Sequence, residues 1–189
     1  MTNELSAEML IDLMNEVVNV RSFKKEHIQK EDLRDLLEAF RHGASTANQQ
    51  PWEILVLNDE QKEKIADSML DPFYNETNGQ AQPWIKDVPT LILITLEERR
   101  TKARFGDFGL HINGQDTFTA IQNLRIMASV KGLSTAVIRE FKQKEISEIL
   151  QLPRTFIPFA MVAIGYANEE KEYPPRLSVE EIVHWGEMS

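Results

Sequence analysis

The residues of this sequence that could do chemistry are gathered in one short polar segment. Gly43–Trp52 reads Gly-Ala-Ser-Thr-Ala-Asn-Gln-Gln-Pro-Trp, with no apolar period and a proline near its end, which predicts a loop. Its hydroxyl and amide groups are short, so they could hydrogen-bond a bound molecule while the backbone comes close to it. The same residue types favour ordinary turns, so a purely structural capping cluster is the alternative.

Other reactive groups are few. The chain has no cysteine, which excludes disulfides, thiolate catalysis, cysteine-based zinc sites and iron–sulfur clusters. Its 4 histidines are scattered, none with a second histidine or a carboxylate at metal-ligand spacing on a helix, so we expect no metal site. No glycine-rich dinucleotide fingerprint, P-loop or Gly-x-Ser-x-Gly elbow occurs. A chain of this kind can still do redox chemistry if it holds a flavin.

The bulk properties are those of a globular protein. The chain has 189 residues, 42% of them hydrophobic and 27% charged, which suits a single domain with a buried core. Its net charge of -9 does not favour nucleic acid as a partner. We see no signal peptide, and the longest apolar runs, Leu91–Leu96 and Phe159–Ile164, are too short to span a membrane. We therefore expect a soluble, cytoplasmic protein.

The polar loop is expected between a helix and a strand. The spacing of Leu33, Leu36, Leu37 and Phe40 predicts an amphipathic helix over residues 31–42 that ends at Gly43. A strand follows at Ile54–Leu57. Asn58, with Gln61 three residues later, predicts the cap of a helix that runs to about Leu70.

The remaining pattern interleaves helices with buried strands, which indicates an α/β or α+β class. We predict a first helix around Leu10–Val17, a charged exposed run at 97–104 and a flexible glycine-rich segment at 106–114. Further predictions are buried strands at 90–96 and 159–164, helices at 116–131 and 142–150, an extended segment at 133–138, and irregular structure at 71–83. The first helix and the long tail from Ala167 would suit packing against a second subunit.

The polar loop resembles the signature loop of the FMN-dependent nitroreductases, approximately Ala-Pro-Ser-Ser-x-Asn-x-Gln-Pro-Trp, which also lies between an amphipathic helix and a strand. Ser45, Asn48, Gln50, Pro51 and Trp52 match it, and Ala44 replaces the first proline. Further matches occur in family order from about Leu10 to Trp185: Val20-Arg21-Ser22-Phe23, Gln82, Gln122-Asn123-Leu124, Gly132-Leu133 and Pro175-Arg176-Leu177.

The resemblance implies an α+β fold with a central, mostly antiparallel sheet flanked by helices. It also implies an intertwined homodimer with two FMN sites at the interface. Residues 1–189 would form a single domain, and about 167–189 would wrap around the partner subunit.

The resemblance also implies which residues hold FMN. Arg21 would reach the pyrimidine edge of the flavin, where a cation suits the negative charge of the reduced ring. The loop residues Ser45, Thr46, Asn48 and Gln50 would seat the ring, with Gln82 nearby. Backbone around Val137 and Ile138 would lie over the flavin, with an N–H near N5. Arg176 would bind the phosphate, because a guanidinium donates two parallel hydrogen bonds.

Three positions depart from the family pattern. Val17 and Asn19 stand where the family has Arg and Ser, and Pro174 stands where the tail motif has Lys. Each lost charge-assisted contact is worth roughly 1.5–3 kcal/mol, so FMN would bind more weakly or be held by another cation such as Lys24 or Arg125. Arg139-Glu140 stands near N5, where the family often has Gly, which suggests a narrowed substrate pocket.

The implied function is an FMN-dependent NAD(P)H oxidoreductase. NAD(P)H would deliver hydride to the flavin, which would then reduce a nitroaromatic, quinone or similar small acceptor in a ping-pong cycle without a catalytic side chain. Two alternatives stay open. One is a relative that uses the flavin differently, such as a dehalogenase or flavin-destroying enzyme. The other is a flavin-binding or interaction protein of the same fold without turnover.

Overall fold

The centre of the molecule is an antiparallel sheet of four strands in the order β1-β4-β6-β5. The structure, a computed structural model, describes residues 6–71 and 80–188. The strands are β1 (Trp52–Leu57), β4 (Thr90–Glu97), β5 (Ser134–Ile138) and β6 (Phe156–Gly165). The fold is α+β with an antiparallel sheet, as the resemblance implied, and the strands expected near 54, 90, 133 and 159 are confirmed.

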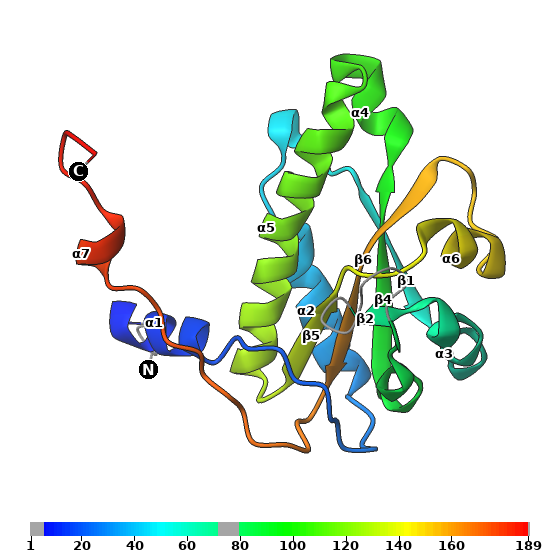
Figure 1. Ribbon diagram of the computed structural model, residues 1–189, viewed down its shortest axis with the longest axis horizontal. Coiled ribbons are helices and arrows are strands. Elements are labelled where there is room, and N and C mark those ends of the chain that lie inside the picture. The colour runs from blue at the N-terminus through cyan, green and yellow to red at the C-terminus, as the bar shows by residue number, and fades with distance from the viewer. Residues whose placement is uncertain (1–5, 72–79, 189) are drawn as a thin grey trace.

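Helices cover both faces of this sheet, and the alternation of side chains along β4 explains how (Figure 1). Ile92 and Ile94 point into a core shared with α2 (Lys30–Arg41) and α5 (Phe108–Val130). Leu91 and Leu93 belong to a second core on the other face, beneath α3 (Asp59–Ile65) and α6 (Gln143–Ile149). Because both faces of the strand are buried, its sequence is apolar at nearly every position.

Several local predictions are confirmed by specific contacts. Asn58 caps α3, and its side chain and that of Gln61 each bond the other's backbone N–H. The 3-10 turn η2 (Ala66–Ser68) continues α3. The short strands β2 (Leu70–Asp71) and β3 (Gln80–Ala81) and the turn η4 (Pro83–Asp87) follow. Most of the irregular segment predicted at 71–83 lies outside the described residues.

One prediction is incomplete and another is wrong. The charged run is mostly exposed, as predicted, but it also forms a helix, α4 (Glu98–Phe105), which begins where the buried Glu97 accepts a hydrogen bond from the Arg100 N–H. The glycine-rich segment expected to be flexible is the first third of α5. Its glycines allow close packing: a Cβ on Gly109 would lie 3.0 Å from Thr101, and one on Gly114 would lie 3.1 Å from the Phe159 ring.

The two chain ends form an arm beside the body, which we define as residues 6–16 and 169–188 (Figure 1). It contains α1 (Ala7–Asn15) and α7 (Val179–Ile182). Glu16 joins the two ends, because it accepts hydrogen bonds from Lys171 Nζ at 2.8 Å and the Tyr173 hydroxyl at 2.9 Å. No residue of α1 is buried. The arm exposes large apolar side chains: Met9, Ile11, Met14, Leu177, Val179, Ile182, Trp185 and Met188.

Within the described residues, no helix is long and apolar enough to cross a membrane. The same part of the chain contains no group of three His, Asp or Glu side chains that could hold a metal ion.

Candidate functional site

A hollow of about 180 Å³ lies beside β5, the edge strand of the sheet, and brings together four of the residues expected to hold a flavin. Arg21, Gln82, Val137 and Ile138 all line it. Its other lining residues are Asn19, Trp84, Ala136, Arg139 and Glu140. The backbone after β5 and the N-terminal segment thus meet at one place, although they are more than 100 residues apart in sequence.

The N-terminal segment is held there by pairing with β5. Asn19 bridges Thr135 in a parallel arrangement, and the Val20 N–H donates to the Thr135 carbonyl at 3.1 Å. Val20 and Phe23 are both buried, so Arg21 is fixed between two anchored neighbours. The Arg21 N–H donates to Glu169 Oε1 at 2.6 Å. The position of Arg21 therefore follows from the packing on either side of it.

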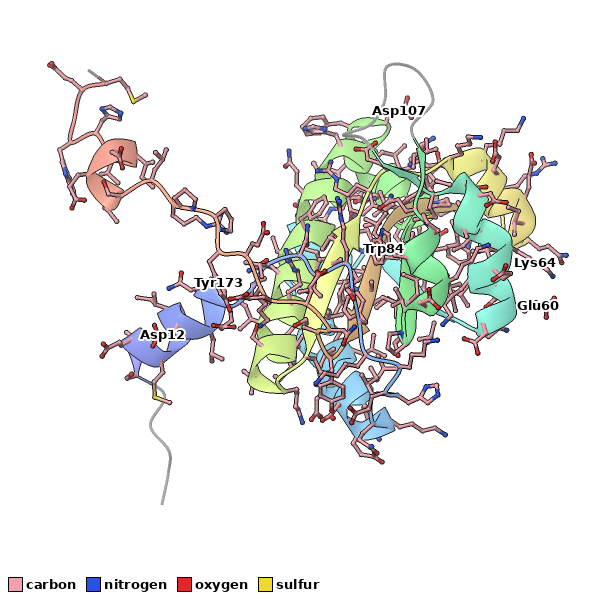
Figure 2. The ribbon with its side chains drawn as sticks, turned by 60° about the horizontal axis from the view of Figure 1, so that its bottom comes forward. Asp12, Glu60, Lys64, Trp84, Asp107 and Tyr173 are labelled. Carbon is pink, nitrogen blue, oxygen red and sulfur yellow. The ribbon has the colours of Figure 1, made fainter. Side chains whose placement is uncertain are left out.

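Gln82 is buried, and its amide is already occupied within the chain. Its Nε2 donates to the Leu70 carbonyl, and its Oε1 accepts from Trp84 Nε1 at 3.3 Å. Trp84, which is labelled in Figure 2, in turn stacks on Phe23, with ring centroids 6.4 Å apart. These contacts give Gln82 the role of supporting the wall of the hollow.

A second hollow adjoins the first, because Asn19 lines both. It contains Arg176, the residue expected at a phosphate, and Arg125 from α5. Burial and the charge of Arg176 lower the pKa of Arg125. The remaining lining residues are Val17, Val18, Glu172, Tyr173 and Pro174. Two guanidinium groups facing one open hollow suit an anion such as a phosphate.

The polar loop lies elsewhere: it packs on α5 around Asp116 and Thr119, further toward the N-terminal end of the helix (Figure 1). Ser45, Thr46, Asn48 and Gln50 line neither hollow. The Thr46 N–H donates to Asp116 Oδ2 at 2.7 Å, and its hydroxyl donates to Asp116 Oδ1 at 3.2 Å. Asp116 and Arg125 are separated by about 14 Å along the helix, at about 1.5 Å per residue. The structure therefore divides the predicted site residues into two sets.

The loop is held in a strained conformation. Ala47, Asn48 and Gln50 have φ values of 54°, 55° and 46°, which residues other than Gly rarely adopt. The Gln50 N–H donates to Ser45 Oγ at 3.0 Å. Arg100 on α4 donates to the Gln50 and Trp52 carbonyls, at 2.8 Å and 3.2 Å. Strain of this kind persists only where surrounding contacts enforce it, and it is typical of functional sites.

Comparison with known proteins identifies the family of the chain. Residues 19–166, more than half of the chain, match the Nitroreductase family. The chain belongs to the nitroreductase family. The protein named FMN reductase (NAD(P)H) of Bacillus subtilis is 27% identical over 193 residues, covering 90% of this chain and 74% of that protein. The iodotyrosine deiodinase of Thermotoga neapolitana is 24% identical over 188 residues, covering 91% and 96%.

Solved structures of nitroreductases share the fold. A nitroreductase family protein from Streptococcus pneumoniae TIGR4 matches with a TM-score of 0.79 at 17% identity, over 93% of this chain and 98% of that one. An FMN-dependent nitroreductase from Clostridium difficile R20291 matches with a TM-score of 0.75 at 20% identity, over 94% and 99%. At these identities the likeness establishes the fold alone.

The departures from the nitroreductase pattern gather in the second hollow. Val17 and Pro174, which stand in place of cations, both line it, and so does Arg125. Lys24 does not line it, although its backbone N–H donates to the Tyr166 carbonyl at 2.9 Å. Lys24 and Arg125 were the two cations proposed from the sequence as replacements, and of these Arg125 shares the hollow with Arg176.

Three supporting residues were not predicted to take part in the site. Asp116 fixes the loop, Arg100 holds its end, and Asn19 joins the two hollows. Asp116 begins a family-like helix, but only the folded structure shows that it reaches the loop, because 70 residues lie between it and Thr46.

Proposed function

We propose that this chain is an NAD(P)H-dependent flavin oxidoreductase that holds FMN and reduces a nitroaromatic, quinone or similar small acceptor. Membership in the nitroreductase family, and the relative named FMN reductase (NAD(P)H), support the flavin and the reductant. The observation that carries the proposal is the pair of adjoining hollows. One offers Arg21 and β5 backbone to a flat polar ring, and the other offers two guanidinium groups to a phosphate.

FMN, when bound, supplies a ring that accepts hydride from NAD(P)H and passes electrons to the acceptor in a second, ping-pong step. The chain's own residues bind and orient. Arg21 places a positive charge where the pyrimidine edge of the ring would lie, which favours the reduced, negatively charged ring. Arg139 and Glu140 flank the same hollow and are exposed, so they would shape entry of the acceptor.

The polar loop completes the site from a second copy of this chain in our proposal. At about 180 Å³, the hollow beside β5 is smaller than the roughly 300 Å³ at which ligand pockets begin. The loop residues predicted to seat the ring lie toward the other end of α5 in the same chain. In a dimer with twofold symmetry, a contact between one region of the first chain and another region of the second chain occurs twice. The loop of each chain would therefore complete the hollow of its partner.

The apolar side chains of the arm support the same assembly. Trp185 is 92% exposed and Met188 is 86% exposed, and large exposed apolar patches mark interaction surfaces. Residues 167–189 would then wrap around the partner subunit within a single-domain protomer.

The test is a spectroscopic titration followed by a kinetic one. The purified protein is incubated with FMN and desalted, and we expect visible flavin bands that NADH or NADPH bleaches anaerobically. Menadione or a nitroaromatic should then restore them, and initial rates should show ping-pong dependence on the two substrates. A colourless protein after desalting from excess FMN would refute the flavin proposal. Retained flavin without bleaching would favour the alternative, a flavin-binding protein without turnover.

A further inference from the structure

Arg125 lies in the second hollow in a fixed orientation. It projects from the C-terminal part of α5, where its Nε donates to Thr135 Oγ1 at 3.1 Å and its Nη2 donates to Asn19 Oδ1 at 3.0 Å. Thr135 is buried in the edge strand, and Arg125 itself is half-buried. Two neutral partners therefore hold the guanidinium in place without neutralising it.

The charge in this hollow is unbalanced. Among residues 6–71 and 80–188, neither Arg125 nor Arg176 forms an ion pair, although the Glu172 carboxylate also lines the hollow. Burial and the neighbouring charge of Arg176 lower the pKa of Arg125, so the two cations repel each other across the hollow. An anion between them would relieve this repulsion, and a dianion would do so most strongly.

We propose that Arg125 and Arg176 together bind the phosphate of FMN, and that Arg125 takes over from the cations absent at Val17 and Pro174. The assignment rests on the proposed function, because it requires FMN to be the ligand. The assignment is based on position, because Val17 and Pro174, which stand where the family has cations, line the same hollow as Arg125. A cation from the central helix thus compensates for two cations missing from the N-terminal segment and the tail.

A phosphomonoester could come from FMN or from the ribose of NADPH, and the geometry favours FMN. Asn19 Oδ1 accepts from Arg125 and also from the Val137 N–H, at 3.2 Å. The phosphate hollow is therefore joined directly to the hollow assigned to the ring. FMN has a ring and a phosphate linked by a short chain, which suits two adjoining hollows.

The decisive experiment compares FMN with riboflavin, which has the same ring and no phosphate. Dissociation constants for both are measured by flavin fluorescence for the full-length wild type, Arg125→Gln, Arg125→Lys and Arg154→Gln. Arg154 is an exposed arginine beside α6, so Arg154→Gln makes the same charge change away from the hollow. We expect Arg125→Gln to raise the dissociation constant for FMN about ten- to a hundredfold and to change that for riboflavin by no more than about twofold. Arg125→Lys should lose less FMN affinity, because lysine keeps the positive charge but lacks the planar guanidinium group.

Each outcome separates the claims. Equal weakening of FMN and riboflavin in Arg125→Gln would mean that Arg125 only supports Asn19 and Thr135, which would overturn the inference. An unchanged preference for FMN, with a raised KM for NADPH but not NADH, would assign the hollow to the reductant instead. Wild-type protein that binds neither FMN nor riboflavin would refute the proposed function itself. Inorganic phosphate should compete with FMN but not with riboflavin in the wild type.

Discussion

The two sets of predicted site residues contact α5 at different heights, the loop at Asp116 and the hollows near Arg125, and the two regions differ in how they are held. Near Asp116, the loop is strained, and hydrogen bonds from Thr46 to Asp116 and from Gln50 to Ser45 hold its shape within the chain. Near Arg125, the hollow is open and its two cations repel each other. The loop is held by its own contacts, whereas the hollow around Arg125 keeps two neighbouring cations whose repulsion an anion would relieve.

Removal of residues 169–189 should have the largest effect on FMN binding and on dimer formation, because it removes Arg176 and the C-terminal half of the arm. A chain that ends at Asn168 keeps the bond from the Asn168 N–H to the Ser22 carbonyl, so the body should still fold. We expect it to be monomeric by light scattering and to lose FMN. Full-length Arg176→Gln is the matched control and should remain dimeric. A truncated chain that still dimerises would contradict the assignment of the tail to the interface.

Mixed dimers test whether the two sets meet across an interface. Arg176→Gln impairs one set, and Asn48→Asp impairs the other while keeping the shape of its side chain. If each site takes one set from each chain, a mixed dimer has one intact site and one with both defects. We therefore expect flavin in about half of its sites at a concentration that leaves both parent homodimers nearly empty. Mixed dimers as empty as the parents would place both sets in one chain.

Gly43 tests how closely the loop end must approach α5. A Cβ at Gly43 would lie 2.5 Å from the Ala120 Cβ and 2.6 Å from its Cα, so Gly43→Ala must displace backbone. We expect it to lower the free energy of unfolding by about 3 kcal/mol, in urea titrations followed by circular dichroism. Gly132→Ala is the control. Gly132 has a φ of +68°, but no atom lies within 4 Å of an added Cβ, so we expect the free energy of unfolding to fall by only about 1 kcal/mol. Equal losses would show that the approach at Gly43 is not tight.

The elements were largely predictable from sequence, because they depend on local spacing. The Asn58 cap, the end of α5 at Gly132 and the buried strands each follow from a few neighbouring residues. The start of α5 was not predictable, because its glycines are typical of a loop in sequence, whereas in the fold they leave room for Thr101 beside Gly109 and for Phe159 beside Gly114.

The family resemblance predicted which residues form the candidate site, and the structure shows how they are arranged. The family resemblance supplied Arg21 and Arg176, and the structure places them in adjoining hollows. The separation of the loop from those hollows depends on which ends of α5 they contact. That depends on the path of the whole chain, which no single motif contains.

Strain in the loop can be tested at Ala47, whose φ of 54° costs about 1–2 kcal/mol for a residue other than Gly. Ala47→Gly removes this cost but adds freedom to the unfolded chain, so we expect a net stabilisation of about 0.5 kcal/mol. Thermal unfolding measures this change. If the strained shape serves the ligand, FMN affinity should fall even as stability rises. Unchanged affinity would mean that the loop contacts alone preserve its shape.

The smallest effect on stability should come from the exposed pair of Glu16 and Lys171, which joins the two halves of the arm. The hydrogen bonds from Lys171 and then Tyr173 hold the pKa of Glu16 below its ordinary value. Because the pKa is lowered on folding, the contact stabilises the arm fully above the ordinary Glu pKa of about 4.3 and is lost as the pH falls through the lowered value. As a surface pair it contributes less than about 1 kcal/mol.

Hydrogen exchange of the arm amides, compared between wild type and Glu16→Gln at each pH, measures this contribution. At neutral pH the wild type should exchange more slowly than the variant, since Gln cannot form the ion pair with Lys171. Below about pH 4 the difference should shrink, because a protonated Glu16 resembles Gln. A difference that persists there would mean that Glu16 stabilises the arm without its charge, for example through its bond with the Tyr173 hydroxyl. Equal exchange at every pH would mean that the arm is held by its apolar side chains and not by Glu16.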